Sequence, residues 1–204
     1  MLSRGETEGV FQLESSGMKQ VLVGLQPQNL EDVIALISLY RPGPMDSIPT
    51  YLRNRHEPDK ISYKTPQLAH ILDVTNGCIV YQEQVMQIFR ELAGFSFGQA
   101  DNVRRAMSKK KHAVMEAERE HFVHGCTDPG NECPGCVANG ISEKVANEIY
   151  DEMSSFASYA FNKSHAACYA YVAFQTAYLK CHYPSEFMAA LLTSVLDNTG
   201  KVIE

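Results

Sequence analysis

The segment from Phe161 to Tyr169 places a cation, an imidazole, an amide and a phenol within about two and a half helical turns. Lys163 can reach a phosphate group, His165 can donate a hydrogen bond to one, and Tyr169 can stack on a base or sugar. Asn162 stands where a helix begins, and the free N–H groups of a helix start favour anions. These residue types indicate a triphosphate or nucleic-acid site. The alternative is that His165 and Tyr169 are hydrogen-bonded core residues and that Asn162 only caps the helix.

A second basic cluster lies well upstream. Arg104 and Arg105 flank the expected apolar side of a helix, and three lysines follow where that helix ends: Lys109, Lys110 and Lys111. Guanidinium groups bind phosphate oxygens through two parallel hydrogen bonds, whereas lysines act as point charges. We therefore expect phosphate contacts from the arginines and contacts to a nucleic-acid backbone from the lysines. The alternative is a solvated helix end whose lysines complement the helix dipole.

A cysteine-rich stretch supplies possible metal ligands. Cys133 and Cys136 form one C-x₂-C pair, Cys126 lies upstream, and His124 or His121 can complete the set. Structural zinc requires four nitrogen or sulfur ligands in a tetrahedron. One pair without a matching second pair leaves free thiols as the alternative. The other three cysteines are expected to be buried thiols on apolar helix faces: Cys78, Cys168 and Cys181.

Carboxylates that could bind catalytic metals are not grouped in the sequence. Metal-dependent nucleotidyl transfer needs two or three carboxylates that converge on two cations. Glu14, Glu83 and Asp101 instead stand alone among polar helix residues. The sequence also lacks a phosphate-binding P-loop, a nucleophile elbow and a dinucleotide-binding fingerprint. The basic and aromatic residues therefore indicate a surface that holds a substrate rather than a complete active site.

The elements that must position these residues are almost all helical. Asn29 is a good N-cap for a helix from Leu30 to Tyr40, in which apolar residues recur at intervals of three and four. That helix must end at Arg41-Pro42-Gly43-Pro44, because proline cannot continue it. Arg41 then lies at the helix C-terminus, where a cation is favoured and can act as a cap.

Further helices are expected over the ranges 84–93, 99–108, 112–123, 142–156, 164–183 and 184–196, with one short helix between residues 47 and 66. Residues 77–81 form the one stretch that predicts a short strand. Residues 125–140 are rich in glycine, proline, cysteine and asparagine and predict a loop inserted between two helices. The predicted fold class is all-α, mainly helical, with at most one or two short strands.

The formal net charge of −6 argues against a wholly basic nucleic-acid coat, so a polyanion must bind at a local patch. No stretch approaches the roughly 20 apolar residues of a membrane span, and the first residues lack the apolar region of a signal peptide. We therefore expect a cytoplasmic protein that does not enter a membrane, with reduced cysteines unless a metal binds them. Neither end shows a natural start or stop, which predicts that the chain is part of a longer one.

Five motifs occur in order along the chain: Gly9-Val10-Phe11-Gln12-Leu13-Glu14-Ser15, Tyr40-Arg41-Pro42-Gly43-Pro44, Tyr81-Gln82-Glu83-Gln84-Val85-Met86, Arg104-Arg105-Ala106-Met107 and Phe161-Asn162-Lys163-Ser164-His165. With these motifs the chain resembles the bacterial replicative DNA polymerase III alpha subunits, of the C family, over nearly its whole length. The resemblance implies a helical fingers domain over residues 11–204, with residues 1–10 as the remnant of the junction to the palm.

In that family the fingers cover the incoming deoxynucleoside triphosphate and contact the template and primer. The resemblance implies a nucleotide-binding set on this chain: Arg41, Arg104, Arg105, Asn162, Lys163, His165 and Tyr169. It implies Mg²⁺ ions bound by palm aspartates upstream of the matched region, so that this chain alone is inactive. Its implied partners are primer-template DNA, deoxynucleoside triphosphates and other subunits of the replicase. The cysteine-rich loop departs from the family's shorter or cysteine-poor connection, so no catalytic role is carried over to it.

A function of another class also accounts for the basic residues. The chain can instead be a standalone helical binding or scaffold module that meets nucleic acid nonspecifically. Salt dependence does not separate the two hypotheses, because both predict it. Binding of a triphosphate at Lys163, His165 and Tyr169 separates them.

Overall fold

The computed structural model describes residues 1–109, 112–157, 159–196 and 200. The chain divides into two units, and each is described by itself: residues 1–37 with 164–204, and residues 38–163. The boundaries fall inside helix α2, which spans Leu30–Leu39, and at the start of helix α10, which spans Lys163–His182. The predicted boundary at residue 10 stays a prediction.

The fold is helical, as predicted, and the described residues contain isolated bridges but no β-strand. The unit of residues 38–163 contains seven α-helices among the described residues: α3 Ile48–His56, α4 Ala69–Leu72, α5 Gln82–Ala93, α6 Phe97–Ser108, α7 His112–His124, α8 Gly135–Ala138 and α9 Glu143–Ala157. Short 3₁₀ turns lie at Pro44–Ser47, Pro58–Lys60, Pro66–Leu68 and Asp73–Thr75. No helix of the described part is both long and apolar enough to cross a membrane.

The strand predicted at residues 77–81 is wrong. Asn76 and Gly77 have φ angles of 51° and 78°, so the chain leaves the preceding 3₁₀ turn in a left-handed conformation. In this stretch only Tyr81 pairs with another segment, through one isolated parallel bridge to Phe161. One bridge cannot build a strand, but it does join two distant segments at the start of α5.

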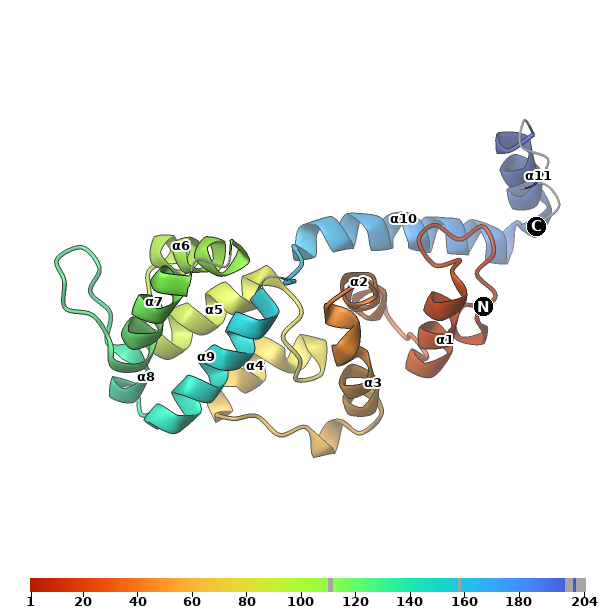
Figure 1. Cartoon of the computed structure of the whole chain (residues 1–204). Helices are drawn as coiled ribbons and strands as arrows, with labels where there is room; N and C mark the ends of the chain where they lie inside the picture. Colours follow the sequence, from red (N-terminus) through yellow and green to blue (C-terminus); the bar gives the residue numbers. More distant parts are fainter. Residues whose placement is uncertain (110–111, 158, 197–199, 201–204) are drawn as a thin grey trace. The chain divides into compact units, whose positions relative to one another are not determined.

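Helix α5 forms the centre of this unit, since it packs against α4, α6, α7, α8 and α9 (Figure 1). Its partners bury a cluster of aromatic rings around Phe89, which lies 5.0 Å from the ring of Phe122 and 5.2 Å from that of Phe95. Tyr150 of α9 closes the cluster, 6.0 Å from Phe89, and its hydroxyl donates to the Met115 carbonyl at 2.5 Å. Aromatic pairs at these separations stabilise a core beyond their area burial.

A buried glutamine fixes where α5 begins. The Gln84 side-chain oxygen accepts hydrogen bonds from the backbone N–H groups of Val80 and Tyr81, both at 2.9 Å. Its amide nitrogen donates to the Ile71 carbonyl at 3.1 Å and to the Thr75 hydroxyl at 2.7 Å. Because a buried amide must satisfy its donors and acceptor, these bonds hold the residues before α5 in one conformation.

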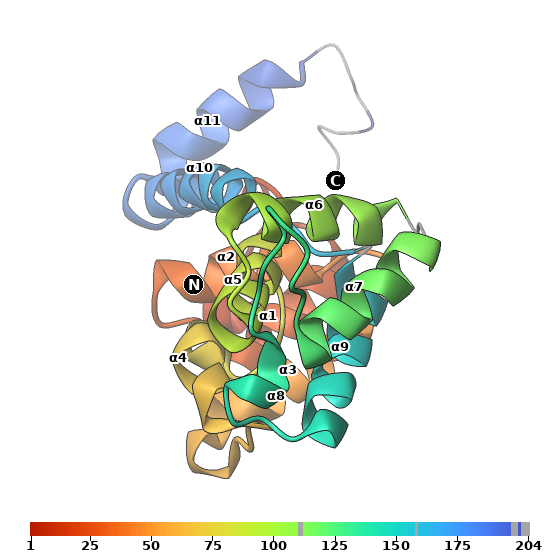
Figure 2. The same cartoon turned by 90° about the vertical axis from the view of Figure 1, so that its left-hand side faces the viewer.

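The cysteine-rich segment is a hairpin followed by a short helix. Cys126 and Cys133 exchange two backbone hydrogen bonds of 2.9 Å in an antiparallel bridge, and α8 follows at once. Figure 2 shows this hairpin between α7 and α8. The insertion predicted as a loop over residues 125–140 is therefore ordered at its base by backbone pairing and by one helical turn.

The other unit combines both ends of the chain. It contains α1 (Ser16–Leu25), most of α2, α10 from Ser164 onwards and α11 (Pro184–Ser194), with a 3₁₀ turn at Leu2–Arg4. Helix α10 buries a stripe of small residues: Ala166, Ala170, Ala173 and Ala177. Helix α2 begins as predicted, because the Asn29 side chain accepts a hydrogen bond from the Asp32 N–H at 2.9 Å.

Candidate functional site

The start of α5 is joined to the segment that precedes α10. Gln82, the first residue of α5, donates its backbone N–H to the Phe161 carbonyl at 3.0 Å and its side-chain amide to the Ala160 carbonyl at 3.0 Å. The Phe161 N–H in turn donates to the Val80 carbonyl at 3.3 Å. These bonds place the residues just after Phe161 beside the N-terminal turn of α5.

Glu83 binds the start of α10. Its carboxylate accepts a hydrogen bond from the Asn162 side-chain amide at 2.9 Å and from the Lys163 backbone N–H at 3.2 Å. The sequence predicts this helix start as a place for a phosphate, but a carboxylate already occupies its first N–H group. A phosphate near Lys163 must therefore be held by side chains rather than by that backbone group.

Arg104 connects α6 to the same point. Its Nε and Nη2 atoms donate to one carboxylate oxygen of Asp101 at 3.0 and 2.7 Å, and Nη1 donates to the Gln82 side-chain oxygen at 3.0 Å. The side chain is 20% exposed. The hydrogen bonds from Arg104 lower the pKa of Asp101, so this carboxylate is charged at neutral pH. Arg104 is thus a link between two helices.

Arg105 differs from its neighbour in accessibility. Its side chain is 65% exposed and lies 2.8 Å from the second carboxylate oxygen of Asp101. An ion pair at such exposure contributes little to stability and gives way easily to a stronger anion. Lys109 is also exposed, at the C-cap of α6. Lys110 and Lys111, predicted to contact DNA, lie outside the described residues.

Arg41 lies beyond the end of α2, in the loop that the prolines predict. Its guanidinium carbon is 4.5 Å from the centroid of the Phe161 ring, a cation–π contact. Gly43 has a φ of 100°, and a Cβ atom there would lie 2.3 Å from the Tyr159 ring. A glycine is therefore required for this loop to pack. The ring of Phe161 places Arg41 next to the segment that carries Asn162 and Lys163.

Lys163 completes the cluster. Its ammonium lies 5.3 Å from the centroid of the Tyr81 ring, which is 1% exposed. Within residues 38–163 the structure thus gathers four predicted site residues at the start of α5, and Arg105 follows Arg104 directly on α6. The gathered residues are Arg41, Arg104, Asn162 and Lys163. Their cations outnumber the two carboxylates, Glu83 and Asp101, so the cluster is positive.

His165 and Tyr169 belong to the other unit. Their ring centroids lie 4.6 Å apart, and the Tyr169 ring lies 5.5 Å from that of Phe11 in the N-terminal loop. Phe11 and His165 are exposed, whereas Tyr169 is half-buried. The three rings form an aromatic surface that the sequence predicts only in its α10 part.

The predicted zinc site is not found. Among the residues that the structure describes, no three His, Cys, Asp or Glu side chains are arranged to hold a metal ion. Cys126, Cys133 and Cys136 instead join the hydrophobic core, and burial raises the pKa of Cys136 to about 12. His124 is half exposed and lies 3.9 Å from Glu143.

The prediction for the remaining cysteines is right for one and wrong for two. Cys78 is buried, and burial raises its pKa to about 11. Cys168 and Cys181 are exposed. Both lie on α10, whose buried stripe consists of alanines, so their side chains fall on the solvent side of that helix.

Side-chain chemistry alone does not identify two residues that organise the basic cluster. In the sequence Gln82 and Glu83 look like ordinary polar residues of a first helical turn, and Glu83 stands alone. Their position in the motif from Tyr81 to Met86 was the available signal. Among the described residues no carboxylates are grouped so that three could hold a metal ion.

Comparison with known proteins gives consistent matches. The model of the finger domain of the bacterial DNA polymerase III alpha subunit matches residues 1–130. The chain is 51% identical over 209 aligned positions to a DNA polymerase III subunit alpha of Thermus aquaticus, which covers the whole chain and 16% of that relative. It is 46% identical to subunits of the same name from Staphylococcus epidermidis and Staphylococcus aureus, over 98% and 100% of the chain. The chain spans 18% of those two relatives' length.

Proposed function

Because the chain belongs to the finger-domain family of bacterial DNA polymerase III alpha subunits, we propose that it is the part of a replicative DNA polymerase that binds the incoming deoxynucleoside triphosphate and primer-template DNA. The whole enzyme carries out template-directed nucleotidyl transfer, and this chain contributes binding and positioning. The observation that carries the proposal is the positive cluster at the start of α5, where two basic segments far apart in sequence meet.

Within this proposal Arg105 makes the direct contact to the triphosphate. It is the more exposed of the two arginines, and one exposed ion pair holds it. Lys163 adds a second cation, and its place at the start of α10 gives the phosphates two points of contact. Charge-assisted hydrogen bonds to phosphate are among the strongest polar contacts, so a phosphate can replace Asp101 as the partner of Arg105.

Arg104 has a positioning role in the proposal. Its bonds to Asp101 and Gln82 fix α6 against α5 and thereby orient Arg105 on the same helix. Asn162, through Glu83, fixes the segment that carries Lys163. Arg41 supports that segment through the Phe161 ring. His165 and Tyr169, in the other unit, are proposed to contact the sugar or base, and the lysines at 109–111 to contact the DNA backbone.

Divalent metal ions belong to the proposed reaction but not to this chain. In nucleotidyl transfer such ions activate the attacking oxygen and stabilise the leaving one. The described residues offer no carboxylate cluster for them, so the ligands are proposed to lie in the remainder of the longer protein. On this view the 204-residue chain alone is inactive. Its cations lower the barrier by neutralising the triphosphate and holding it in line.

The proposed partners are primer-template DNA, deoxynucleoside triphosphates and the other replicase subunits, in the bacterial cytoplasm. A titration of the isotope-labelled chain with a deoxynucleoside triphosphate tests the proposal by NMR. We expect chemical-shift changes at Arg105, Lys163, His165 and Tyr169. Changes confined to residues 104–112 would instead favour a module that binds any polyanion through its basic helix end.

A further inference from the structure

We propose that Gln12, with the ring of Phe11 beside it, contacts the minor-groove edge of a base pair in the primer-template DNA. The inference rests on the proposed polymerase function and adds a residue that the basic cluster does not include. It comes from the loop of residues 6–14, which hydrogen bonds and packing hold in place while the Gln12 amide faces solvent.

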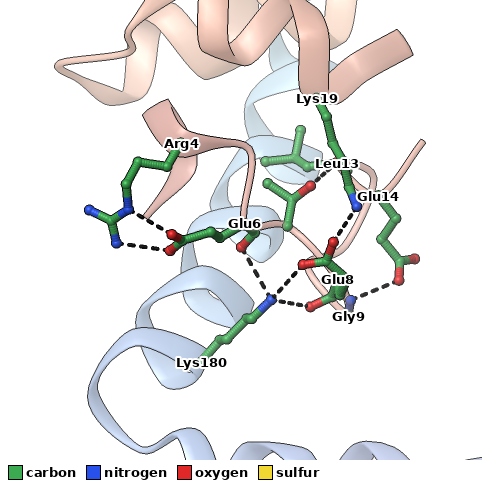
Figure 3. Close-up of polar contacts among 9 residues, drawn as sticks. Arg4, Glu6, Glu8, Gly9, Leu13, Glu14, Lys19 and Lys180 are labelled. Atoms are coloured by element: carbon green, nitrogen blue, oxygen red, sulfur yellow. Dashed lines mark hydrogen bonds and ion pairs between the residues drawn. The ribbon is translucent and has the colours of Figure 1, made fainter. Parts of the chain in front are cut away.

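Several polar contacts fix this loop (Figure 3). The Lys180 ammonium of α10 donates to the carbonyls of Glu6 and Glu8 at 3.2 and 2.8 Å and lies 3.3 Å from the Glu8 carboxylate. Lys19 of α1 pairs with the same carboxylate. Within the loop, the Thr7 hydroxyl donates to the Leu13 carbonyl at 2.5 Å. The loop is therefore tied to two helices and to itself.

Packing fixes the loop as well. Val10 and Leu13 are 0% exposed, and the Leu13 N–H donates to the Val10 carbonyl at 3.1 Å, which closes a tight turn. The Phe11 N–H donates to the Thr176 hydroxyl of α10 at 3.1 Å. The two central residues of the turn, Phe11 and Gln12, are thus left pointing away from the core, and both are exposed.

Gln12 adopts a backbone conformation that its residue type disfavours. Its φ is 65°, at the third position of the turn, where glycine or asparagine is the preferred residue. Its side chain makes no hydrogen bond or ion pair within the described part of the chain. A glutamine in a strained position without a structural contact indicates that the amide serves a ligand, since strain of this kind is concentrated at binding sites.

The neighbouring rings indicate what that ligand is. Phe11, Tyr169 and His165 form the aromatic surface described above, with centroid separations of 5.5 and 4.6 Å. Exposed rings bind the flat faces of bases and sugars without regard to sequence. An amide N–H beside them can donate to N3 of a purine or O2 of a pyrimidine, the minor-groove acceptors that every Watson–Crick pair presents. Such a contact accepts all four correct pairs, as template-directed synthesis requires.

The test uses the full-length polymerase subunit and two primers. One primer ends in guanine, and the other ends in 3-deazaguanine, which lacks the N3 acceptor. Single-turnover extension rates are measured for wild type, Gln12→Gly and Gln12→Met. Glycine suits the positive φ, and methionine keeps the length of the side chain but has no donor. We expect each variant to extend the normal primer roughly two- to tenfold more slowly, the effect of one lost hydrogen bond.

The analogue supplies the decisive comparison. It should slow wild type by a similar factor and should not slow either variant further, because the same bond is already lost. Gln20→Ala, an exposed glutamine on α1, is the matched control and should behave as wild type. Extension of the normal primer at the wild-type rate by both variants would overturn the inference. So would a further slowing of the variants by the analogue primer, by the same factor as in wild type. Absence of any extension by the wild-type subunit would overturn the proposed function, a distinguishable result.

Discussion

The structure separates two adjacent arginines that look alike in sequence, and their removal should lower the stability of the chain by different amounts. Arg104→Ala deletes two hydrogen bonds to Asp101 and one to Gln82, from a side chain that is only 20% exposed. The bond to Gln82 contributes about 1 kcal/mol, and the partly exposed ion pair up to about 1 kcal/mol. The sum, about 2 kcal/mol, lowers the melting temperature by roughly 4–8 °C for a chain of this size.

Arg105→Ala is the matched control, since it removes the same side chain one residue later. Its ion pair with Asp101 is exposed, so the loss should be below about 0.5 kcal/mol and the shift below about 2 °C. Thermal unfolding of the two variants, followed by circular dichroism at 222 nm, measures both shifts. Equal melting temperatures for the two variants, or a larger loss for Arg105→Ala, would refute the assignment of Arg104 as the link between α5 and α6.

Two further predictions follow from burial and charge. In the native chain an alkylating reagent should modify the exposed Cys168 and Cys181 within minutes. Cys136 and Cys78 should stay protected, because burial raises their pKa values to about 12 and about 11. Mass spectrometry measures the order of modification, and early modification of Cys136 would contradict this prediction. The hydrogen bond from Lys19 lowers the pKa of Glu8 from 4.5 to about 2, so its stabilising contribution is full above about pH 4.5 and is lost as the pH falls toward 2. Between about pH 4.5 and pH 2, Glu8→Gln should therefore lose less stability than wild type or a Glu186→Gln control. The difference should be small, because Glu8 is exposed. Parallel curves of stability against pH for all three proteins would exclude this role of Glu8.

Much of the fold could be read from the sequence because its helices carry strong local signals. Helix α2 begins at the predicted Asn29 cap, and α11 begins at Pro184 as expected. Helix α1 was not predicted, although Ser15 caps it and its buried residues, Met18, Leu22 and Leu25, follow at helical spacing. Only the cap, Ser15, lies inside one of the five motifs; the apolar spacing follows it.

The site was less predictable, because its geometry depends on long-range pairing. Both basic segments were identified from residue types, but their meeting point at Gln82 and Glu83 depends on hydrogen bonds between residues about 80 positions apart. The cysteine-rich hairpin raises a related point, since among the described residues it brings no set of metal ligands together. Ligand spacing along the chain says nothing of whether a hairpin turns its thiols toward a shared point or into the core.

The proposed binding of the triphosphate by Arg105 is tested most directly by single-turnover nucleotide incorporation with the full-length subunit, measured over a range of nucleotide concentrations. For Arg105→Ala we expect the apparent Kd for the nucleotide to rise, or the maximal rate to fall, by roughly tenfold or more, as the loss of a charge-assisted bond to phosphate implies. Affinity for primer-template DNA should change little. Normal incorporation kinetics in this variant would contradict the account.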